Sequence, residues 1–403
     1  MSELGGSAWL VGEGLSDALC DRRPGAYQIC AATPIESWLA RFPRVVPTRP
    51  AEGLVMIPTA SGPVDVSAPR EGNHVLGDLA RRCFTIHAIA WNPVSGEWLD
   101  PFGGLADVRA KRLRTVGDPA SRLTQDPSRA LRVARLAGQL GYRVDTALRE
   151  VLGKTLRPLT PALRLQVRRE LMPLLLSPAA GSGIELLRSS GIEALLVPEA
   201  RGDSGTVIEQ LPPVLALRLA AWLRGTNAAQ VLARLRIGRE LAIRVQRLLR
   251  HHPIDSCHTS PERALRQLND DDVAALFALR RAELDAARTR SEQPAHRPAL
   301  LSPAELDRLE EKVLAARSAA AAAREAGPLA LGGAQIMQLL GCGPGPQVGR
   351  ALAFLASCVA ENPECNTRDG LRERLESWAQ ASPPANTAAE KNPEKKSGAS
   401  AAW

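Results

Sequence analysis

The sequence predicts an α+β protein in which a mixed-sheet head is followed by an all-α remainder. Between residues 8 and 115, short β-like runs are separated by clusters of Gly, Pro and Ser, whereas every periodic segment from Asp126 onward has helical spacing. Aromatic residues make up only 3% of the chain, so its cores must be built from Leu, Ala and Val, which suits helices. A length of 403 residues exceeds one compact core and favours two to four domains.

Strands and helices alternate within the predicted head. Apolar and β-branched runs predict strands over residues 8–11, 27–30, 54–58 and 64–66. Two helices are expected between them, over residues 14–19 and 34–40, and the second is entered through Thr33 and Pro34.

The remainder of the chain is expected to be helical. Helical periodicity predicts helices over residues 127–141, 145–154, 161–176, 182–191, 211–224, 228–236, 239–251, 261–268, 271–289, 303–326, 334–340, 346–360 and 368–380. Gly141 and Gly191 stand where helix C-caps belong. Ser302 and Glu305 have the spacing of a capping box.

These patterns divide the chain into five parts. We expect a nucleotidyltransferase-like head over 1–125, a helical neck with a nucleotide- or RNA-binding helix over 126–200, a helical body over 201–300 and a helical tail over 301–380. Residues 381–403 lack apolar periodicity and should be disordered.

Net charge and cysteine usage indicate the kind of partner and the cellular compartment of the protein. The net charge of +8 permits an anionic partner such as RNA, although a generally Arg-rich proteome would explain it equally well. Seven scattered cysteines without a C-x-x-C pair indicate reduced thiols in the cytoplasm and no zinc site. The N-terminus lacks the features of a signal peptide, and no apolar run approaches membrane-spanning length. We therefore expect a cytoplasmic protein without membrane contact; the sequence does not predict its oligomeric state.

The most specific motif lies at the start of the predicted neck. Asp126 precedes a proline at the expected first helical position, and arginines follow at every third residue. These arginines are Arg129, Arg132 and Arg135. An acid and guanidinium groups near a helix N-terminus offer an acceptor and donors to a nucleotide. The alternative is that the arginines form scaffold ion pairs, for which the candidate acids are Asp118, Asp145 and Glu150.

Gln125, Asp126 and Arg129 together resemble the Glu-Asp-x-x-Arg motif of the tRNA nucleotidyltransferase (CCA-adding enzyme) and poly(A) polymerase family, of the bacterial class II type. Further stretches resemble family motifs in the same order along the chain: 10–17, 26–34, 64–70, 78–90, 100–104, 194–199, 341–349 and 361–368. The resemblance implies a family fold of head, neck, body and tail. It also implies transfer of CMP or AMP from CTP or ATP to tRNA or another structured RNA.

The resemblance also implies binding residues. Those expected to contact a nucleotide are Gly12, Gly14, Arg81, Arg82, Asp126, Arg129, Arg132 and Arg135. Arg164 and Arg168 share part of one helix face and are expected to contact RNA. The region 231–250 is strongly basic, and is either a further RNA surface or an ordinary solvated face.

The chain departs from the family where catalysis needs metal ions. Two Mg²⁺ ions require carboxylates, which two acids at positions i and i+2 of one strand can supply from a single face. The resemblance assigns these positions to Ala26 and Gln28, neither of which is an anionic ligand, and only Asp65 remains of the expected carboxylates. No metal site is therefore expected. The sequence predicts an RNA-binding protein with impaired or absent catalysis. The alternative is an active, Mg²⁺-dependent CTP/ATP:tRNA nucleotidyltransferase or poly(A) polymerase with a non-standard metal site.

Other departures surround the same place. Glu13 replaces a glycine of the family's phosphate-binding turn, and so adds negative charge where a phosphate would approach. Cys83 and His87 replace an Asp and an Asn of the element that the family uses around the nucleotide sugar. We expect Cys83 to be a small buried side chain and His87 to be structural.

Overall fold

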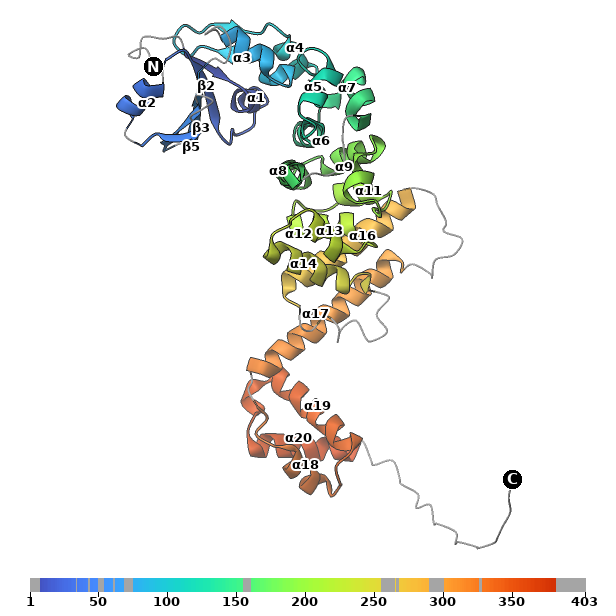
Figure 1. Cartoon of the computed structure of the whole chain (residues 1–403). Coiled ribbons are helices and arrows are strands. Elements are labelled where there is room, and N and C mark those ends of the chain that lie inside the picture. Colours follow the sequence, from blue (N-terminus) through green and yellow to red (C-terminus); the bar gives the residue numbers. More distant parts are fainter. Residues whose placement is uncertain are drawn as a thin grey trace, which may run out of the picture. The chain divides into compact units, whose positions relative to one another are not determined.

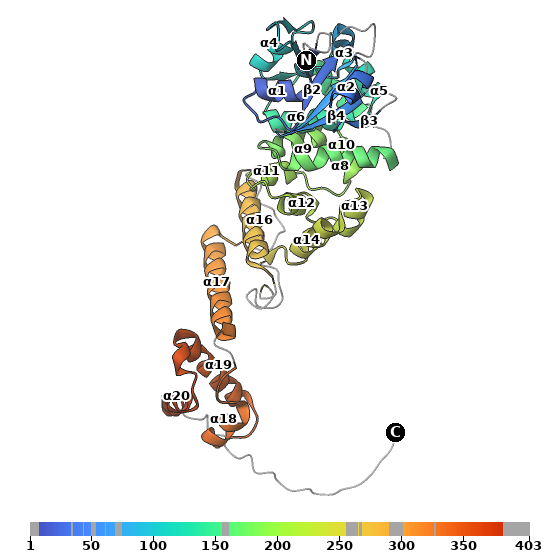
Figure 2. The ribbon, with the colours of Figure 1, turned by 90° about the vertical axis from the view of Figure 1, so that its left-hand side faces the viewer.

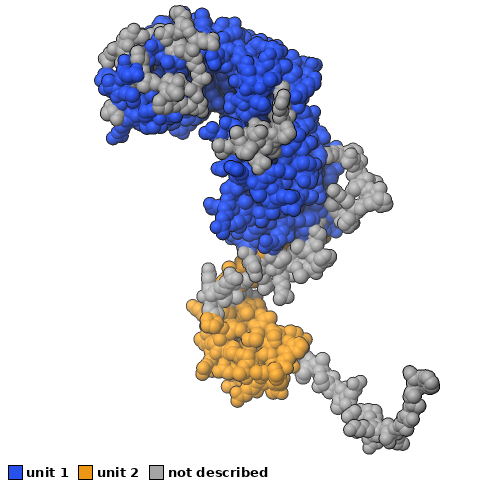
Figure 3. Space-filling model, in the orientation of Figure 1, with its two compact units in different colours: residues 1–259, 267–306 blue, residues 260–266, 307–403 orange. Residues whose placement is uncertain are grey.

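The computed structural model describes residues 8–33, 35–42, 44–49, 54–60, 62–68, 75–154, 161–254, 265, 268–289, 301–325 and 328–381. The expected helix over 261–268 and the segment after 381 fall almost wholly outside these residues. The chain divides into two compact units, residues 1–259 with 267–306 and residues 260–266 with 307–403 (Figure 3). The five-part division expected from the sequence stays a prediction.

A seven-stranded mixed sheet forms the first part of the chain (Figure 1). Its strands are β1 (Ala8–Val11), β2 (Tyr27–Ala31), β3 (Val46–Arg49), β4 (Leu54–Thr59), β5 (Gly62–Ser67), β6 (Ala90–Trp91) and β7 (Trp98–Leu99). Their order in the sheet is β3-β4-β5-β2-β1-β6-β7; β2 and β5 run parallel and the other neighbours are antiparallel. The α+β class with a mixed-sheet head is confirmed, and so are the four predicted strands.

Each face of this sheet has its own core. Cys30 of β2 packs with Leu79 of α3 (Val75–Arg81) on one face. The next residue, Ala31, packs with Trp38 of α2 (Ile35–Arg41) on the other. Helices α1 (Glu13–Leu19) and α2 lie on opposite sides of β2 in both ribbon views (Figures 1 and 2). The period of two along the strand thus decides which side chains face α3.

Besides β3, β6, β7 and α3, the sequence did not predict several short elements before and after β6 and β7. They are the 3₁₀ turn η3 (Thr85–His87), helices α4 (Gly104–Arg109) and α5 (Pro119–Gln125), and the parallel pair β8 (Arg112–Leu113) and β9 (Arg143–Val144). The expectation that only helices follow Asp126 is therefore wrong at β9. Two residues are too few to produce a readable period, and the pairing partner lies far along the chain.

Helices make up the rest of the described chain. They are α6 (Arg129–Leu140), α7 (Thr146–Val151), α8 (Pro161–Leu175), α9 (Ala180–Ser189), α10 (Ile192–Leu196), α11 (Ser204–Glu209), α12 (Leu215–Leu223), α13 (Ala228–Arg234), α14 (Arg239–Arg250), α16 (Asp270–Thr289), α17 (Pro303–Glu325), α18 (Gly333–Leu340), α19 (Pro346–Glu361) and α20 (Arg368–Ala381), with 3₁₀ turns η4 (Leu152–Lys154) and η7 (Pro363–Cys365). The long predicted helices are confirmed, whereas α10 and α11, of five and six residues, were not predicted.

Predicted caps occur where expected. Gly141 ends α6 in the left-handed conformation at φ 65°. Gly191, at φ 78°, follows the last residues of α9 and separates this helix from α10. Ser302 and Glu305 exchange hydrogen bonds, because Glu305 Oε2 accepts from the Ser302 backbone N–H at 2.7 Å while Ser302 Oγ accepts from the Glu305 N–H at 3.3 Å.

Glycine allows α6 to pack closely on its neighbours. A Cβ at Gly138 would lie 2.7 Å from Ser177 Oγ and 2.8 Å from Leu174 Cδ1, so no larger residue fits without a shift. Gly183 of α9 is similarly crowded, since its Cβ would lie 3.0 Å from the Ala134 carbonyl oxygen of α6. These contacts fix α6 against α8 and α9.

The second unit has an apolar core of its own. Leu331, Ile336, Leu355, Leu371 and Leu375 are buried together in it, and they come from α18, α19, α20 and the segment before α18. Across the described residues of both units, no helix combines the length and the apolar composition required to traverse a bilayer.

Candidate nucleotide and RNA interface

The turn between β1 and α1 contains the two predicted glycines. Gly12 has φ 81° and ψ −154°, a conformation that is essentially confined to glycine, and it caps the N-terminus of α1. A Cβ at Gly14 would clash with the Ala26 carbonyl oxygen, so this glycine allows α1 to approach the backbone that leads into β2. The turn is thus held by backbone geometry, and its nucleotide-binding role stays a prediction.

Gln28 and Asp65 are paired neighbours across the parallel strands β2 and β5. Gln28 shares the α3 face with Cys30, two residues later, and its Oε1 accepts a hydrogen bond from Arg82 Nη1 at 3.1 Å. Arg82 also pairs with Asp78, at 2.9 Å between Nη2 and Oδ2. Burial raises the pKa of Asp65 above its usual value. A guanidinium–amide contact therefore lies where the resemblance expects metal ligands.

These residues do not fit a two-metal clamp. Ala26, just before β2, has no ligand atom, and Gln28 offers only a neutral amide oxygen that is already bonded. Among the described residues, no group of three or more His, Cys, Asp or Glu side chains is placed to hold a metal ion. A side chain at Gly12 would clash with Gln28 Oε1 and would lie 2.5 Å from Arg82 Nη1, so both groups lie directly against the turn.

The acid of the neck motif lies three residues before the first residue of the helix, rather than directly before it. α6 begins at Arg129 rather than at residue 127, and Asp126 has an extended backbone at φ −148° and ψ 97°. Pro127 accounts for the extended Asp126, because the residue before a proline avoids the helical region. The backbone N–H groups of Arg129, Ala130 and Leu131 bond to carbonyl oxygens three residues earlier, so the turn after Asp126 is not yet α-helical. Asp126 Oδ1 accepts from the Ser128 backbone N–H at 3.0 Å and from Ser128 Oγ at 2.6 Å, so the carboxylate fixes the turn that leads into the helix.

Arg129 lies beside that acid, as the motif predicts. Its Nε is 3.7 Å from Asp126 Oδ2, and its Nη1 donates to the Arg122 carbonyl oxygen at 2.9 Å and to Gln125 Oε1 at 3.3 Å. The structure brings the acid and the guanidinium together, while their contact with a nucleotide stays a prediction.

Arg132 and Arg135 share a buried carboxylate. Glu170 of α8 accepts from Arg132 Nε at 2.9 Å and from Arg135 Nε at 2.7 Å. Arg135 Nη1 also donates to Glu13 Oε1 at 2.7 Å, across the start of α1. Ion pairing thus occurs, but with Glu13 and Glu170 rather than with the acids named from the sequence, because the packing of α6 on α8 decides the partners.

Glu170 is the site residue that sequence reasoning missed. It is 6% exposed and lies on one helical stripe with Val167, Leu171 and Leu174. An acid within such a stripe needs a buried partner, and this was the available signal. The identity of that partner depends on tertiary packing.

Burial and the neighbouring Arg135 determine the protonation states of the titratable groups around the turn. Burial would raise the pKa of Glu13, but the hydrogen bond and charge of Arg135 outweigh it and hold that pKa below its usual value. Burial lowers the pKa of His87 to about 4, and raises the pKa of Cys83 to about 11. At neutral pH the site therefore contains a neutral imidazole and a protonated thiol beside an ionised acid–guanidinium pair.

The remaining predicted residues are Arg81 of α3 and Arg164 and Arg168 of α8. Arg81 is exposed in the last turn of α3 and Arg168 is exposed on α8. Arg164 belongs to α8, but its side chain lies outside the described part of the structure.

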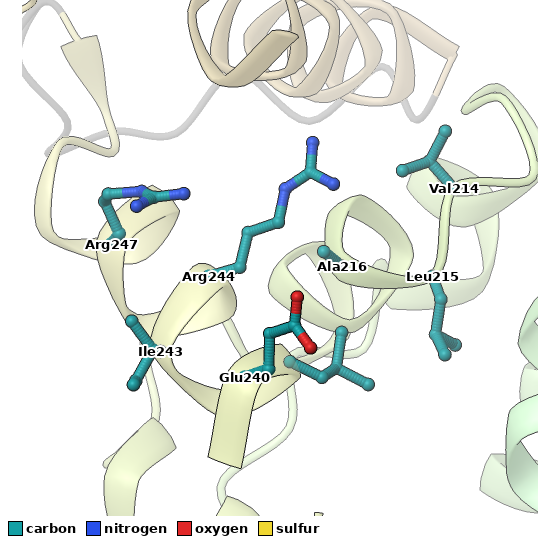
Figure 4. A pocket seen from close by; sticks show the side chains of 8 residues that line it. Val214, Leu215, Ala216, Glu240, Ile243, Arg244 and Arg247 are labelled. Carbon is teal, nitrogen blue, oxygen red and sulfur yellow. The ribbon is translucent and has the colours of Figure 1, made fainter. Parts of the chain in front are cut away.

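The basic region around α14 borders a groove of about 560 Å³ (Figure 4). Arg244 and Arg247 line it from α14, opposite Val214 at the start of α12, and both bind Asp272 of α16, at 2.9 and 2.6 Å. Asp272 has no exposed surface, so two guanidinium groups share one buried charge. Three further arginines are exposed nearby: Arg236, Arg239 and Arg250.

The chain is similar in sequence to known nucleotidyltransferases. Residues 58–114 match the model of the poly(A) polymerase head domain. The A-adding tRNA nucleotidyltransferase of Deinococcus radiodurans is 32% identical over 360 residues, covering 76% of this chain and 80% of that protein. The CCA-adding enzyme of Anoxybacillus flavithermus is also 32% identical, over 242 residues that cover 55% of this chain and only 59% of the enzyme.

Solved structures share the fold. The Bacillus stearothermophilus CCA-adding enzyme in complex with CTP superposes with a TM-score of 0.63 at 20% identity, covering 94% of this chain and 95% of that one. The Thermotoga maritima CCA-adding enzyme complexed with tRNA gives a TM-score of 0.60 at 16% identity, covering 94% and 92%.

Proposed function

The chain belongs to the tRNA nucleotidyltransferase and poly(A) polymerase family, and we propose that it is an RNA-binding member in which nucleotidyl transfer is impaired or absent. The observation that carries the proposal is the contact between Gln28 and Arg82 at the expected metal position, next to Ala26. Asp65 is the one remaining acid of the expected set.

The chemistry of the reaction supports this proposal. Nucleotidyl transfer needs one metal ion to activate the terminal hydroxyl of the RNA and another to neutralise the departing pyrophosphate. Mg²⁺ is held by carboxylates in near-octahedral geometry. A lone Asp65 beside a neutral amide and a guanidinium supplies too little negative charge for two divalent ions.

The binding surfaces support an RNA partner. Relatives in the family include enzymes solved in complex with CTP and with tRNA. The chain has a net charge of +8, and exposed arginines lie on α8 and around α14. We propose tRNA or another structured RNA as the partner and ATP or CTP as ligands of the Asp126 and Arg129 pair. We also propose the reducing cytoplasm as the compartment, in keeping with the free thiols of the described cysteines.

Transfer of labelled CMP or AMP to tRNA lacking its terminal CCA tests the loss of catalysis. We expect no incorporation above background with Mg²⁺ and then with Mn²⁺, because two of the expected metal-binding carboxylates are absent. Asp65→Ala is the matched control. Robust incorporation that disappears in Asp65→Ala would instead establish the active enzyme with a non-standard metal site.

A gel shift of the same tRNA at increasing salt tests RNA binding separately. Binding through arginine–phosphate contacts should weaken linearly on a plot of log affinity against log salt. Absence of a shift even at low salt would refute an RNA-binding role.

A further inference from the structure

Glu13 places a carboxylate at the edge of the turn that the family uses to hold phosphate. It is the first residue of α1, directly after Gly12. Its Oε1 lies 2.7 Å from Arg135 Nη1 and its Oε2 lies 3.4 Å from Nη2, so both carboxylate oxygens face one guanidinium. A phosphate would meet a guanidinium with the same two-oxygen geometry.

Every nitrogen of Arg135 is engaged within the protein. Its Nε donates to Glu170, and Nη1 donates to Gln139 Oε1 at 2.6 Å as well as to Glu13. The Arg135 side chain is 9% exposed and that of Glu170 is 7% exposed, whereas the side chain of Glu13 is 42% exposed. Glu13 is therefore the partner that solvent, or a ligand, can reach and displace.

The other side of the turn is occupied as well. Gln28 and Arg82 lie against Gly12, so an anion entering the turn would meet a guanidinium that already has an amide and a carboxylate as partners. Entry of a phosphate would also bring its charge next to the ionised Glu13, and like charges at this range repel.

We propose that Glu13 is a built-in competitor of a nucleoside triphosphate: its carboxylate occupies Arg135 in place of a phosphate, so that ATP or CTP binds only weakly until this ion pair opens. The inference rests on the proposed function, because it takes ATP or CTP to bind at the Asp126 and Arg129 pair, with its phosphates at the turn that the resemblance assigns to them. It adds that nucleotide binding is weakened by the carboxylate of Glu13 as well as by the loss of the metal ligands.

Equilibrium binding of ATP and of CTP to the full chain, measured by calorimetry without RNA, tests the proposal. We expect Glu13→Gln, which removes the charge and keeps the shape, and Glu13→Gly to bind at least tenfold more tightly than the unchanged protein. Glu97→Gln is the matched control, since it removes an exposed carboxylate from the hairpin between β6 and β7 and should leave the affinity unchanged. In the Glu13→Gln background, Arg129→Ala should abolish the gain.

Two results would overturn the proposal. One is unchanged affinity in both Glu13 variants, with the fold verified by circular dichroism; Glu13→Gln preserves the volume of the side chain and one acceptor oxygen should Glu13→Gly fail to fold. The other is tight binding of ATP by the unchanged protein. Neither result bears on nucleotidyl transfer, which the incorporation assay measures, so failure of this inference and failure of the proposed function are distinguishable.

Discussion

At the scale of single residues, the first unit contains an imidazole that the fold keeps neutral. His87 is 9% exposed and lies edge-on to Phe84, with ring centroids 5.8 Å apart. Its pKa falls from 6.5 to about 4 because burial disfavours the charged form. The imidazole is therefore uncharged at neutral pH and packs as a neutral ring.

This burial makes stability depend on pH. Below pH 6.5 the unfolded chain takes up a proton at His87 that the folded chain resists until about pH 4, so the free energy of unfolding should fall through this window by on the order of 3 kcal/mol and then level off. Urea unfolding at pH 7.5, 6, 5 and 4 measures it. In His87→Asn, the free energy of unfolding should lack this fall between pH 6.5 and pH 4. If it falls as much as in the unchanged protein, His87 does not titrate as described.

The sequence revealed which residues are unusual, but not what they contact. The departures at Glu13, Ala26 and Gln28 were visible from the motifs alone. The partner of Glu13 was not, because Arg135 lies 122 residues further along the chain and only folding brings the two together. Glu170 likewise meets Arg135 across 35 residues, through the packing of two helices.

At the scale of elements, length decided what could be predicted. α14 repeats its apolar pattern over several turns, whereas β8 and β9 have two residues each and acquire their structure from each other. α6 was predicted as a helix but begins two residues later than expected, because the turn that starts at Asp126 is closed by hydrogen bonds between residues three apart.

The surroundings of two glycines predict that Gly138→Ala and Gly349→Ala change the free energy of unfolding in opposite directions. Gly138→Ala should destabilise the protein by about 1–3 kcal/mol, because the added methyl group meets Ser177 and Leu174 at less than 3 Å. Gly349→Ala within α19 has no atom in reach of its Cβ and should stabilise by up to about 1 kcal/mol, since alanine favours helix. Chemical denaturation measures both. Equal effects would mean that α6 is not packed as described.

At the scale of the whole molecule, each of the two units buries its own apolar residues. The core of the second unit draws its buried residues from 331–375, and the sheet of the first unit has separate cores on its two faces. Cores that share no residues can lose structure separately.

A substitution in one core should therefore remain local. Leu355→Ala, at a fully buried position of α19, should cost about 2–5 kcal/mol in the second unit because it leaves a cavity. Hydrogen exchange followed by mass spectrometry should show faster exchange in peptides from 328–381 and unchanged exchange in peptides from 8–144. Faster exchange in the sheet as well would show that the two units unfold as one.

The network around Arg135 has an electrostatic consequence for how a polyanion first meets this protein. Glu13 and Glu170 cancel the charges of Arg132 and Arg135, and Asp78 cancels that of Arg82, so the turn contributes little to the long-range field. The net charge of +8 must then act from other places, including the exposed Arg236, Arg239 and Arg250. Electrostatic steering, which acts over about a Debye length, would direct the initial encounter with the proposed RNA partner to the surface around α14 rather than to the turn.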